Sequence, residues 1–195
     1  MSERPAEFLE RQESEAKAFR KALSSESDRG CGLFAAAYLD SSLSDLLYVS
    51  LVANKKIDTD LFYGTAPLAT FSSRIKMAYY LGLISEPCRR DLDIIRAIRN
   101  DFAHNLEIDS FEVQSVQDRC KALAYSYHEK HKDPKAHFVS AVMRILGHIQ
   151  SATLTATQHQ EKPSDVPTEE EKAAYRQVLD EMASKLAEGL DASGE

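Results

Sequence analysis

The stretch GCGLFAAAYLDSSLSDLLYVSLVAN, residues 30–54, decides the fold. Large apolar side chains recur in it at helical spacing, and few polar residues interrupt them. The apolar positions are Leu33, Phe34, Ala37, Tyr38, Leu39, Leu43, Leu46, Leu47, Val49 and Leu51. A helix that is apolar nearly all round belongs in the centre of a bundle or in an oligomer interface. The sequence therefore predicts a helix that occupies one of these two places.

Residues that start and stop helices stand next to this stretch and further along the chain. Ser27 or Asp28 is placed to cap the helix that follows. Gly82 is suited to end a helix, because glycine adopts the left-handed backbone conformation without steric cost. Ser85 fits the N-cap of the next helix, and Pro87 is tolerated in its first turn.

Apolar residues at helical spacing predict six helices besides 30–54. They cover residues 5–24, 68–83, 85–105, 110–129, 134–156 and 169–190. The run from Asp58 to Pro67 contains Gly and Pro and predicts a connecting loop. Helix follows helix through short connections, so the predicted class is all-α, a single helical bundle of about five to seven helices.

The chain changes character near residue 158. Residues 1–157 are expected to form the helical bundle domain. The segment 158–168 is polar and contains two prolines, which is typical of a linker. The remainder of 158–195 is acidic with sparse apolar residues, and we expect a loosely docked or disordered C-terminal helix there.

Composition restricts the class of function. The formal net charge of −7 repels phosphate backbones, so direct DNA binding is not expected. Three cysteines without paired spacing, and a polar N-terminus without a signal peptide, predict reduced thiols in a cytoplasmic protein. The apolar stretches stop short of the ~20 residues that a membrane span needs. No cofactor is expected.

Two histidines have a spacing that is compatible with metal binding. His128 and His131 are three residues apart, as in some helical metal sites. No third ligand stands at a fitting offset, so the sequence predicts no metal site.

The most informative segment runs from Thr65 to Asn105. It contains a Pro-Leu loop, the pattern Ser-x-Arg-x-Lys-x-x-Tyr-x-Leu-Gly-x-Ile, and a helix that ends in Arg-x-x-x-x-His. The residues of these patterns are Pro67, Leu68, Ser72, Arg74, Lys76, Tyr79, Leu81, Gly82, Ile84, Arg99 and His104. On these residues the chain resembles the mannitol operon repressor family, over a core of about residues 30–130.

This resemblance implies a non-enzymatic, transcription-associated regulator that acts through a protein partner. The sequence carries no helix pair of the helix-turn-helix type with a basic second helix. Its most basic segment, residues 89–99, is interleaved with Asp91, Asp93 and Asp101, which indicates a solvated face. The apolar faces of helices 30–54 and 85–105 predict the core of the bundle and a homodimer surface.

A second resemblance overlaps the first. Residues 99–104, Arg-Asn-Asp-Phe-Ala-His, resemble the Arg-Asn-x-x-x-His signature of HEPN domains, some of which are metal-independent ribonucleases. This alternative is a metal-independent endoribonuclease or a toxin-type RNA-cleaving protein. It makes RNA the partner, with Arg99 stabilising the phosphate and His104 moving protons. The two residues lie roughly 140° apart on a helix, so they require a composite site across a dimer. Cleavage of RNA in EDTA that is lost in His104→Ala would identify this alternative.

A structural role is the other interpretation of these residues. Arg99 lies at the edge of an apolar arc, and a half-buried guanidinium needs a carboxylate such as Asp40 or Asp45. The arc consists of Leu92, Ile94, Ile95, Ile98, Phe102 and Leu106. His104 is favoured at a helix C-terminus by the macrodipole. Binding or structural roles are assigned to Arg74, Arg96, Asn100 and Asp101.

Overall fold

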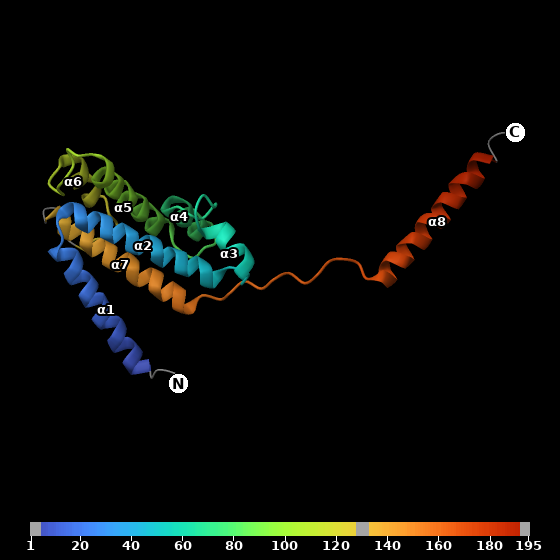
Figure 1. Cartoon of the computed structure of the whole chain (residues 1–195), viewed down its shortest axis with the longest axis horizontal. Coiled ribbons are helices and arrows are strands. Elements are labelled where there is room, and N and C mark those ends of the chain that lie inside the picture. Colours follow the sequence, from blue (N-terminus) through green and yellow to red (C-terminus); the bar gives the residue numbers. More distant parts are fainter. Residues whose placement is uncertain (1–4, 128–132, 192–195) are drawn as a thin grey trace. The chain divides into compact units, whose positions relative to one another are not determined.

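The structure is a computed structural model that describes residues 5–127 and 133–191 (Figure 1). All regular secondary structure in these two ranges is helical, which confirms the all-α class. The helices are α1 (Pro5–Ser25), α2 (Asp28–Ser50), α3 (Lys55–Phe62), α4 (Phe71–Tyr80), α5 (Glu86–His104), α6 (Gln114–Lys121), α7 (Pro134–Thr155) and α8 (Glu169–Asp191). These eight helices exceed the predicted five to seven.

The chain divides into two compact units, Met1–Gln160 and Glu161–Glu195. The first unit holds α1 to α7, and the second holds α8. The apolar side chains of α8 that the structure describes are exposed, namely Tyr175, Val178, Leu179 and Met182. None of the helices in the described ranges combines the length and apolar character that a membrane crossing requires.

The helix α2 is the centre of the first unit. It contacts α1, α4, α5 and α7, and Figure 1 shows it between α5 and α7. The predicted helix 30–54 therefore occupies the first of its two expected places, the centre of a bundle. The helix starts earlier than predicted, because the Ser27 hydroxyl accepts a hydrogen bond from Gly30 N at 3.1 Å and caps it. It ends at Ser50, since Leu51 has extended backbone.

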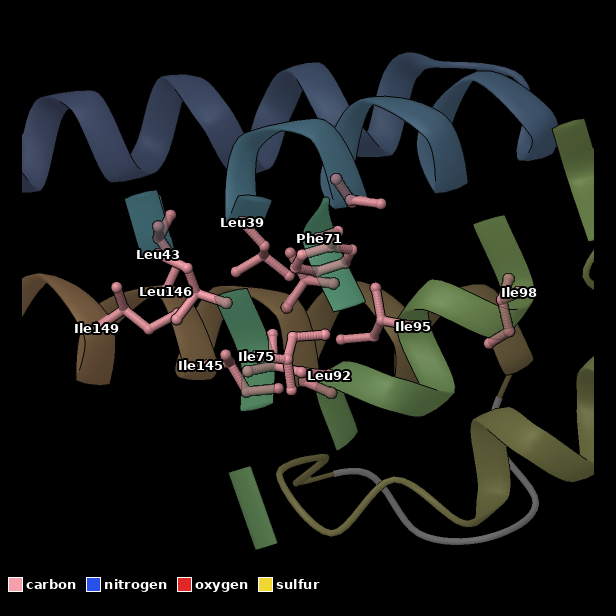
Figure 2. Packing of buried hydrophobic residues seen from close by; sticks show 14 of the residues in the cluster. Leu39, Leu43, Phe71, Ile75, Leu92, Ile95, Ile98, Ile145, Leu146 and Ile149 are labelled. Carbon is pink, nitrogen blue, oxygen red and sulfur yellow. The ribbon is translucent and has the colours of Figure 1, made fainter. Parts of the chain in front are cut away.

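One apolar cluster fills the space between α2, α4, α5 and α7. Figure 2 shows side chains from these four helices pointing toward one another. The labelled members are Leu39, Leu43, Phe71, Ile75, Leu92, Ile95, Ile98, Ile145, Leu146 and Ile149. All of these residues are buried, as expected for a helical bundle that removes its apolar faces from water.

The helices α2 and α5 approach each other closely at Gly32. A Cβ atom added to Gly32 would lie 2.4 Å from Cδ2 of Phe102, whose side chain is fully buried. Only glycine lets the two helices meet at this distance. The predicted burial of Ile95, Ile98 and Phe102 on α5 is confirmed.

The predicted signals around α4 and α5 are confirmed. Gly82 has φ +71 and donates a backbone hydrogen bond to Tyr79 O at 2.9 Å, which ends α4. The Ser85 hydroxyl accepts a hydrogen bond from Cys88 N at 3.4 Å, and Pro87 lies in the first turn of α5. Single residues at these positions therefore set where both helices end and begin.

The structure corrects the predicted loop at 58–67. Residues 55–62 form the helix α3, which Asn54 caps by accepting a hydrogen bond from Lys56 N at 3.2 Å. Phe62 at its end is buried. A helix of two turns carries too few apolar positions to show a period, so the sequence alone predicts a loop there.

Two predictions beyond α5 are wrong. Leu106 is 88% exposed, because α5 ends at His104 and the extended backbone of Asn105 takes Leu106 off the helical arc. Of the predicted helix 110–129, residues 128 and 129 lie outside the described residues, and only α6, Gln114–Lys121, is helical in the remainder. Both errors arise where the backbone leaves helical geometry earlier than the spacing of apolar residues suggests.

Candidate functional site

Arg74 holds the connection between α3 and α4 against α2. Its guanidinium donates to Leu68 O at 2.8 Å and to Phe62 O at 3.2 Å, and it pairs with Asp40 at 2.8 Å. The side chain is only 12% exposed. Of the two roles predicted for Arg74, the contacts are those of a structural role. The predicted pairing of Asp40 with Arg99 is wrong, because Asp40 pairs with Arg74.

The polar face of α5 is largely occupied by ion pairs. Asp101 pairs with Arg119 and so joins α5 to α6. Asp93 lies 2.8 Å from Arg89 and 3.4 Å from Arg96. The Nε atom of Arg96 is buried without a hydrogen-bond partner in the described part of the chain. Most charges of this face are therefore balanced within the bundle.

Asp91 departs from the predicted solvated face. Its side chain is buried, with 1% of the residue exposed. The carboxylate accepts hydrogen bonds from Ala124 N at 3.1 Å and from Tyr125 N at 2.8 Å. Burial raises the pKa of Asp91, although the two N–H donors act in the opposite direction. Asp91 therefore ties α5 to the segment that follows α6.

Asp28 likewise connects the start of α2 to distant segments of the chain. Its carboxylate accepts hydrogen bonds from Phe111 N at 2.9 Å and from the Ser110 hydroxyl at 3.0 Å, and it lies 3.2 Å from Lys135 Nζ. Burial acts to raise the pKa of Asp28, but these three donors outweigh it and bring the pKa below its ordinary value. Sequence reasoning gave Asp28 only a capping role, because Ser110 and Phe111 lie 82 and 83 residues away along the chain.

Arg99 and His104 lie on α5, the first half-buried and the second exposed. Among the residues that the structure describes, Arg99, Asn100 and His104 have no side-chain hydrogen bond or ion pair, so Asp45 is not a partner of Arg99 either. One helix does not bring Arg99 and His104 onto a common face. Their catalytic roles stay a prediction, since a composite site requires a second copy of the chain.

An exposed aromatic face runs along α2, and we call it the α2 stripe. It consists of Phe34, Tyr38 and Tyr48, which are 43%, 38% and 51% exposed. The three positions fall within an arc of about 80° on the helix. Phe19 of α1 supports the stripe from below, with ring centroids 5.6 Å from Phe34 and 4.3 Å from Tyr38. Neighbouring exposed aromatic residues are typical of protein-binding surfaces.

A groove of about 280 Å³ lies beside the stripe, between α2 and α7. It is lined by Tyr38, Ser41, Ser42, Asp45, Ile149, Gln150, Thr153 and Leu154. Leu154 is exposed and extends the apolar surface onto α7. Asp45 is exposed and forms no ion pair with any described residue. The surface therefore combines exposed apolar side chains with a groove that contains a carboxylate unpaired among the described residues.

Sequence reasoning found two members of the stripe, Phe34 and Tyr38, without recognising the face, and it did not single out Tyr48. Phe34 and Tyr38 were counted among the apolar positions of helix 30–54, and a helix that is apolar on every side shows no exposed face. The residue types on α2 do indicate which of its faces is exposed. The buried positions beside them are Ala35, Ala36 and Leu39, whereas a tyrosine hydroxyl prefers contact with water.

The cysteines offer neither nucleophiles nor metal ligands. Cys31, Cys88 and Cys120 are buried, and burial raises the pKa of each thiol to about 12. Over the described residues, no group of three His, Cys, Asp or Glu side chains is placed to hold a metal ion. His128 and His131 lie outside the described residues.

The fold and the surface together define a helical bundle with an exposed aromatic face. Its fold is similar to that of a chain in the X-ray structure of the MtlR–HPr complex from Escherichia coli, with a TM-score of 0.55. The two chains are 18% identical, and the match covers 68% of this chain and 98% of the other. This likeness shows a shared fold. No protein-family profile and no curated protein matches the chain.

Proposed function

We propose that this chain is a regulatory protein that acts by binding a protein partner through the α2 stripe. The observation that carries the proposal is the exposure of Phe34 and Tyr38 beside the groove between α2 and α7. A structural neighbour that was crystallised in complex with HPr supports a protein-binding role. We further propose membership of the mannitol operon repressor family and a link to transcription, on the resemblance of residues 65–105.

The surface indicates the chemistry of the partner. Phe34, Tyr38 and Leu154 call for apolar side chains at the centre of the contact. Asp45 in the groove calls for a lysine or arginine opposite it. The net charge of −7 also favours a basic partner, because opposite charges speed association. HPr, the protein named in the neighbour's complex, is the first partner to test.

The test is a calorimetric titration of the full chain with HPr from the same organism. Tyr38→Ser removes the centre of the stripe, and we expect binding to weaken about tenfold or more. Tyr80→Ser is the matched control, because Tyr80 is an 83% exposed tyrosine at the end of α4, outside the stripe. Equal affinities of wild type and Tyr38→Ser would contradict the proposed surface, and no binding by the wild type would reject HPr as the partner.

The predicted homodimer concerns the same surface. On α5, the apolar residues Ile95, Ile98 and Phe102 are buried within the chain itself, so α5 offers no apolar dimer surface. Of the two helices predicted to form the dimer surface, α2 is therefore the one that offers exposed apolar side chains, in the α2 stripe. Analytical ultracentrifugation at high micromolar concentration shows whether the chain is a monomer or a dimer. A monomer would make the dimer prediction wrong, and a dimer that Tyr38→Ser dissociates would contradict the assignment of the stripe to another protein.

A further inference from the structure

A second hollow, away from the α2 stripe, lies between α1 and α7. It has a volume of about 420 Å³ and is lined by Arg20, Tyr127, Ser140, Met143 and Arg144. A neighbouring hollow of about 200 Å³ shares Arg20 and Ser140 with it. Two arginines from different helices therefore border one depression in the surface.

Neither arginine is paired with a carboxylate. The Arg144 guanidinium lies over the ring of Tyr127 at 3.8 Å from the centroid, and Tyr125 is 5.7 Å away. In residues 5–127 and 133–191, no acidic side chain forms an ion pair with Arg20 or Arg144. This is unusual for the bundle, because most of its described arginines form an ion pair with a carboxylate or donate a hydrogen bond to a carbonyl. Those arginines are Arg29, Arg74, Arg89, Arg90, Arg96 and Arg119.

Two charged residues of the neighbouring hollow, Asp133 and Lys135, have contacts of their own. Asp133, in the neighbouring hollow, caps α7 by accepting a hydrogen bond from Lys135 N at 3.1 Å. Lys135 Nζ lies 3.2 Å from Asp28 and donates to Glu26 O at 2.6 Å. The chain has 31 acidic and 24 basic residues, yet no described carboxylate pairs with these two arginines, so an anion from outside can pair with both.

We propose that this hollow binds a small oxyanion ligand, a phosphate ester or a carboxylate, between Arg20 and Arg144. Guanidinium groups present a planar set of donors that matches both kinds of oxyanion. The Ser140 hydroxyl accepts a hydrogen bond from Tyr127 N at 3.4 Å and keeps its own hydrogen to donate. Tyr127 holds the Arg144 guanidinium by a cation–π contact, and Met143 supplies an apolar wall for the carbon part of the ligand. The volume suits a small molecule.

The test follows backbone amide shifts by NMR in the full chain, during separate titrations with inorganic phosphate and with succinate at constant ionic strength. We expect saturable shifts at Ser140 and Arg144. Tighter binding of phosphate would assign the site to phosphate esters, and tighter binding of succinate would assign it to carboxylates. The site does not depend on the proposed protein-binding role, so either proposal can fail alone.

The variants are Arg20→Gln and Arg144→Gln, with Arg90→Gln as the control because Arg90 is an exposed arginine of α5, outside the hollow. We expect each of the first two to weaken binding at least tenfold and the control to bind as the wild type does. Arg20 is exposed, so its replacement leaves the core intact. The proposal is overturned if neither anion gives saturable shifts, or if the shifts persist unchanged in both variants, which would indicate adventitious anion binding only.

Discussion

The two faces of α2 are both apolar, but small and aliphatic residues form the buried face and aromatic residues lie on the exposed one. Leu39 is fully buried against the other helices of the bundle, whereas its neighbour Tyr38 is 38% exposed. At the inward face Gly32 lies close enough to Phe102 to exclude any side chain, and at the outward face Phe34 rests on Phe19 of α1. An apolar helix can therefore form the core with one face and expose aromatic side chains on the other.

The largest expected effect separates these two neighbours. Leu39→Ala leaves a cavity in the centre of the bundle, and we expect it to lower the free energy of unfolding by about 2–5 kcal/mol. Tyr38→Ser alters a partly exposed position, and we expect a loss of no more than about 1 kcal/mol. Urea unfolding followed by circular dichroism measures both. Equal losses would show that the two faces do not differ in their contribution to stability.

Arg74 and Arg99 also differ in their contacts, because Arg74 has partners within the bundle and Arg99 has none among the described residues. Arg74→Ala removes bonds to two carbonyls and leaves Asp40 unpaired, so we expect a loss of about 1.5–3 kcal/mol of unfolding free energy. Arg99→Ala removes no ion pair with a described residue and is the matched control, with an expected change within about 0.5 kcal/mol. A large loss in Arg99→Ala would show that Arg99 has a structural partner after all.

A substitution at the contact between Gly32 and Phe102 should lower the free energy of unfolding by a smaller amount. Gly32→Ala favours the helix by up to about 1 kcal/mol, but it forces its Cβ into a buried ring that cannot move freely. We expect a net loss of about 1–2 kcal/mol in chemical unfolding. Combining it with Phe102→Leu should cost less than the sum of the two single losses, because the double variant relieves the clash. If the losses of the two single variants simply add in the double variant, the Cβ of Gly32→Ala does not clash with the Phe102 ring.

The smallest predicted effect depends on pH. The pKa of Asp28 in the folded chain lies below its ordinary value of 3.8, so its carboxylate stabilises the fold above pH 3.8. This contribution is lost as the pH falls through the lower, folded pKa. We expect Asp28→Asn to lose about 0.5–1.5 kcal/mol of unfolding free energy at pH 7, and the difference from wild type to shrink below pH 3.8.

The variant must be compared with wild type at each pH, because Asp91 changes stability with pH in the direction opposite to Asp28. Burial raises the pKa of Asp91, so its contribution is fully present below pH 3.8 and is lost as the pH rises through the folded value. The difference between wild type and Asp28→Asn cancels this effect. A difference that stays constant across the range would contradict the assigned role of Asp28.

Local signals in the sequence predicted much of the fold. Ser27, Gly82, Ser85 and Pro87 act on the backbone within a few residues, so their effects on α2, α4 and α5 were predictable. The burial of Ile95 followed from the period of α5 in the same way. These residues act through contacts inside one helix turn, which are visible in a single sequence.

Contacts between distant segments were not predictable in this way. The pairing of Arg74 with Asp40 depends on how α4 meets α2, and the burial of Asp91 depends on the segment after α6. The exposure of Phe34 and Tyr38 depends on which sides of α2 the other helices cover. Each of these features arises from packing, and the spacing of residues along one helix does not encode it.

The most direct test of the two-face account replaces Phe34 with a photoreactive benzoylphenylalanine and irradiates the full chain with HPr. Phe34 is exposed on the stripe, so the account predicts a covalent cross-link to HPr from this position. The same replacement at Tyr80, on α4, should give none. A chain that binds HPr in the titration but forms no cross-link from position 34, or forms one equally from position 80, would contradict the claim that the outward face of α2 is the binding surface.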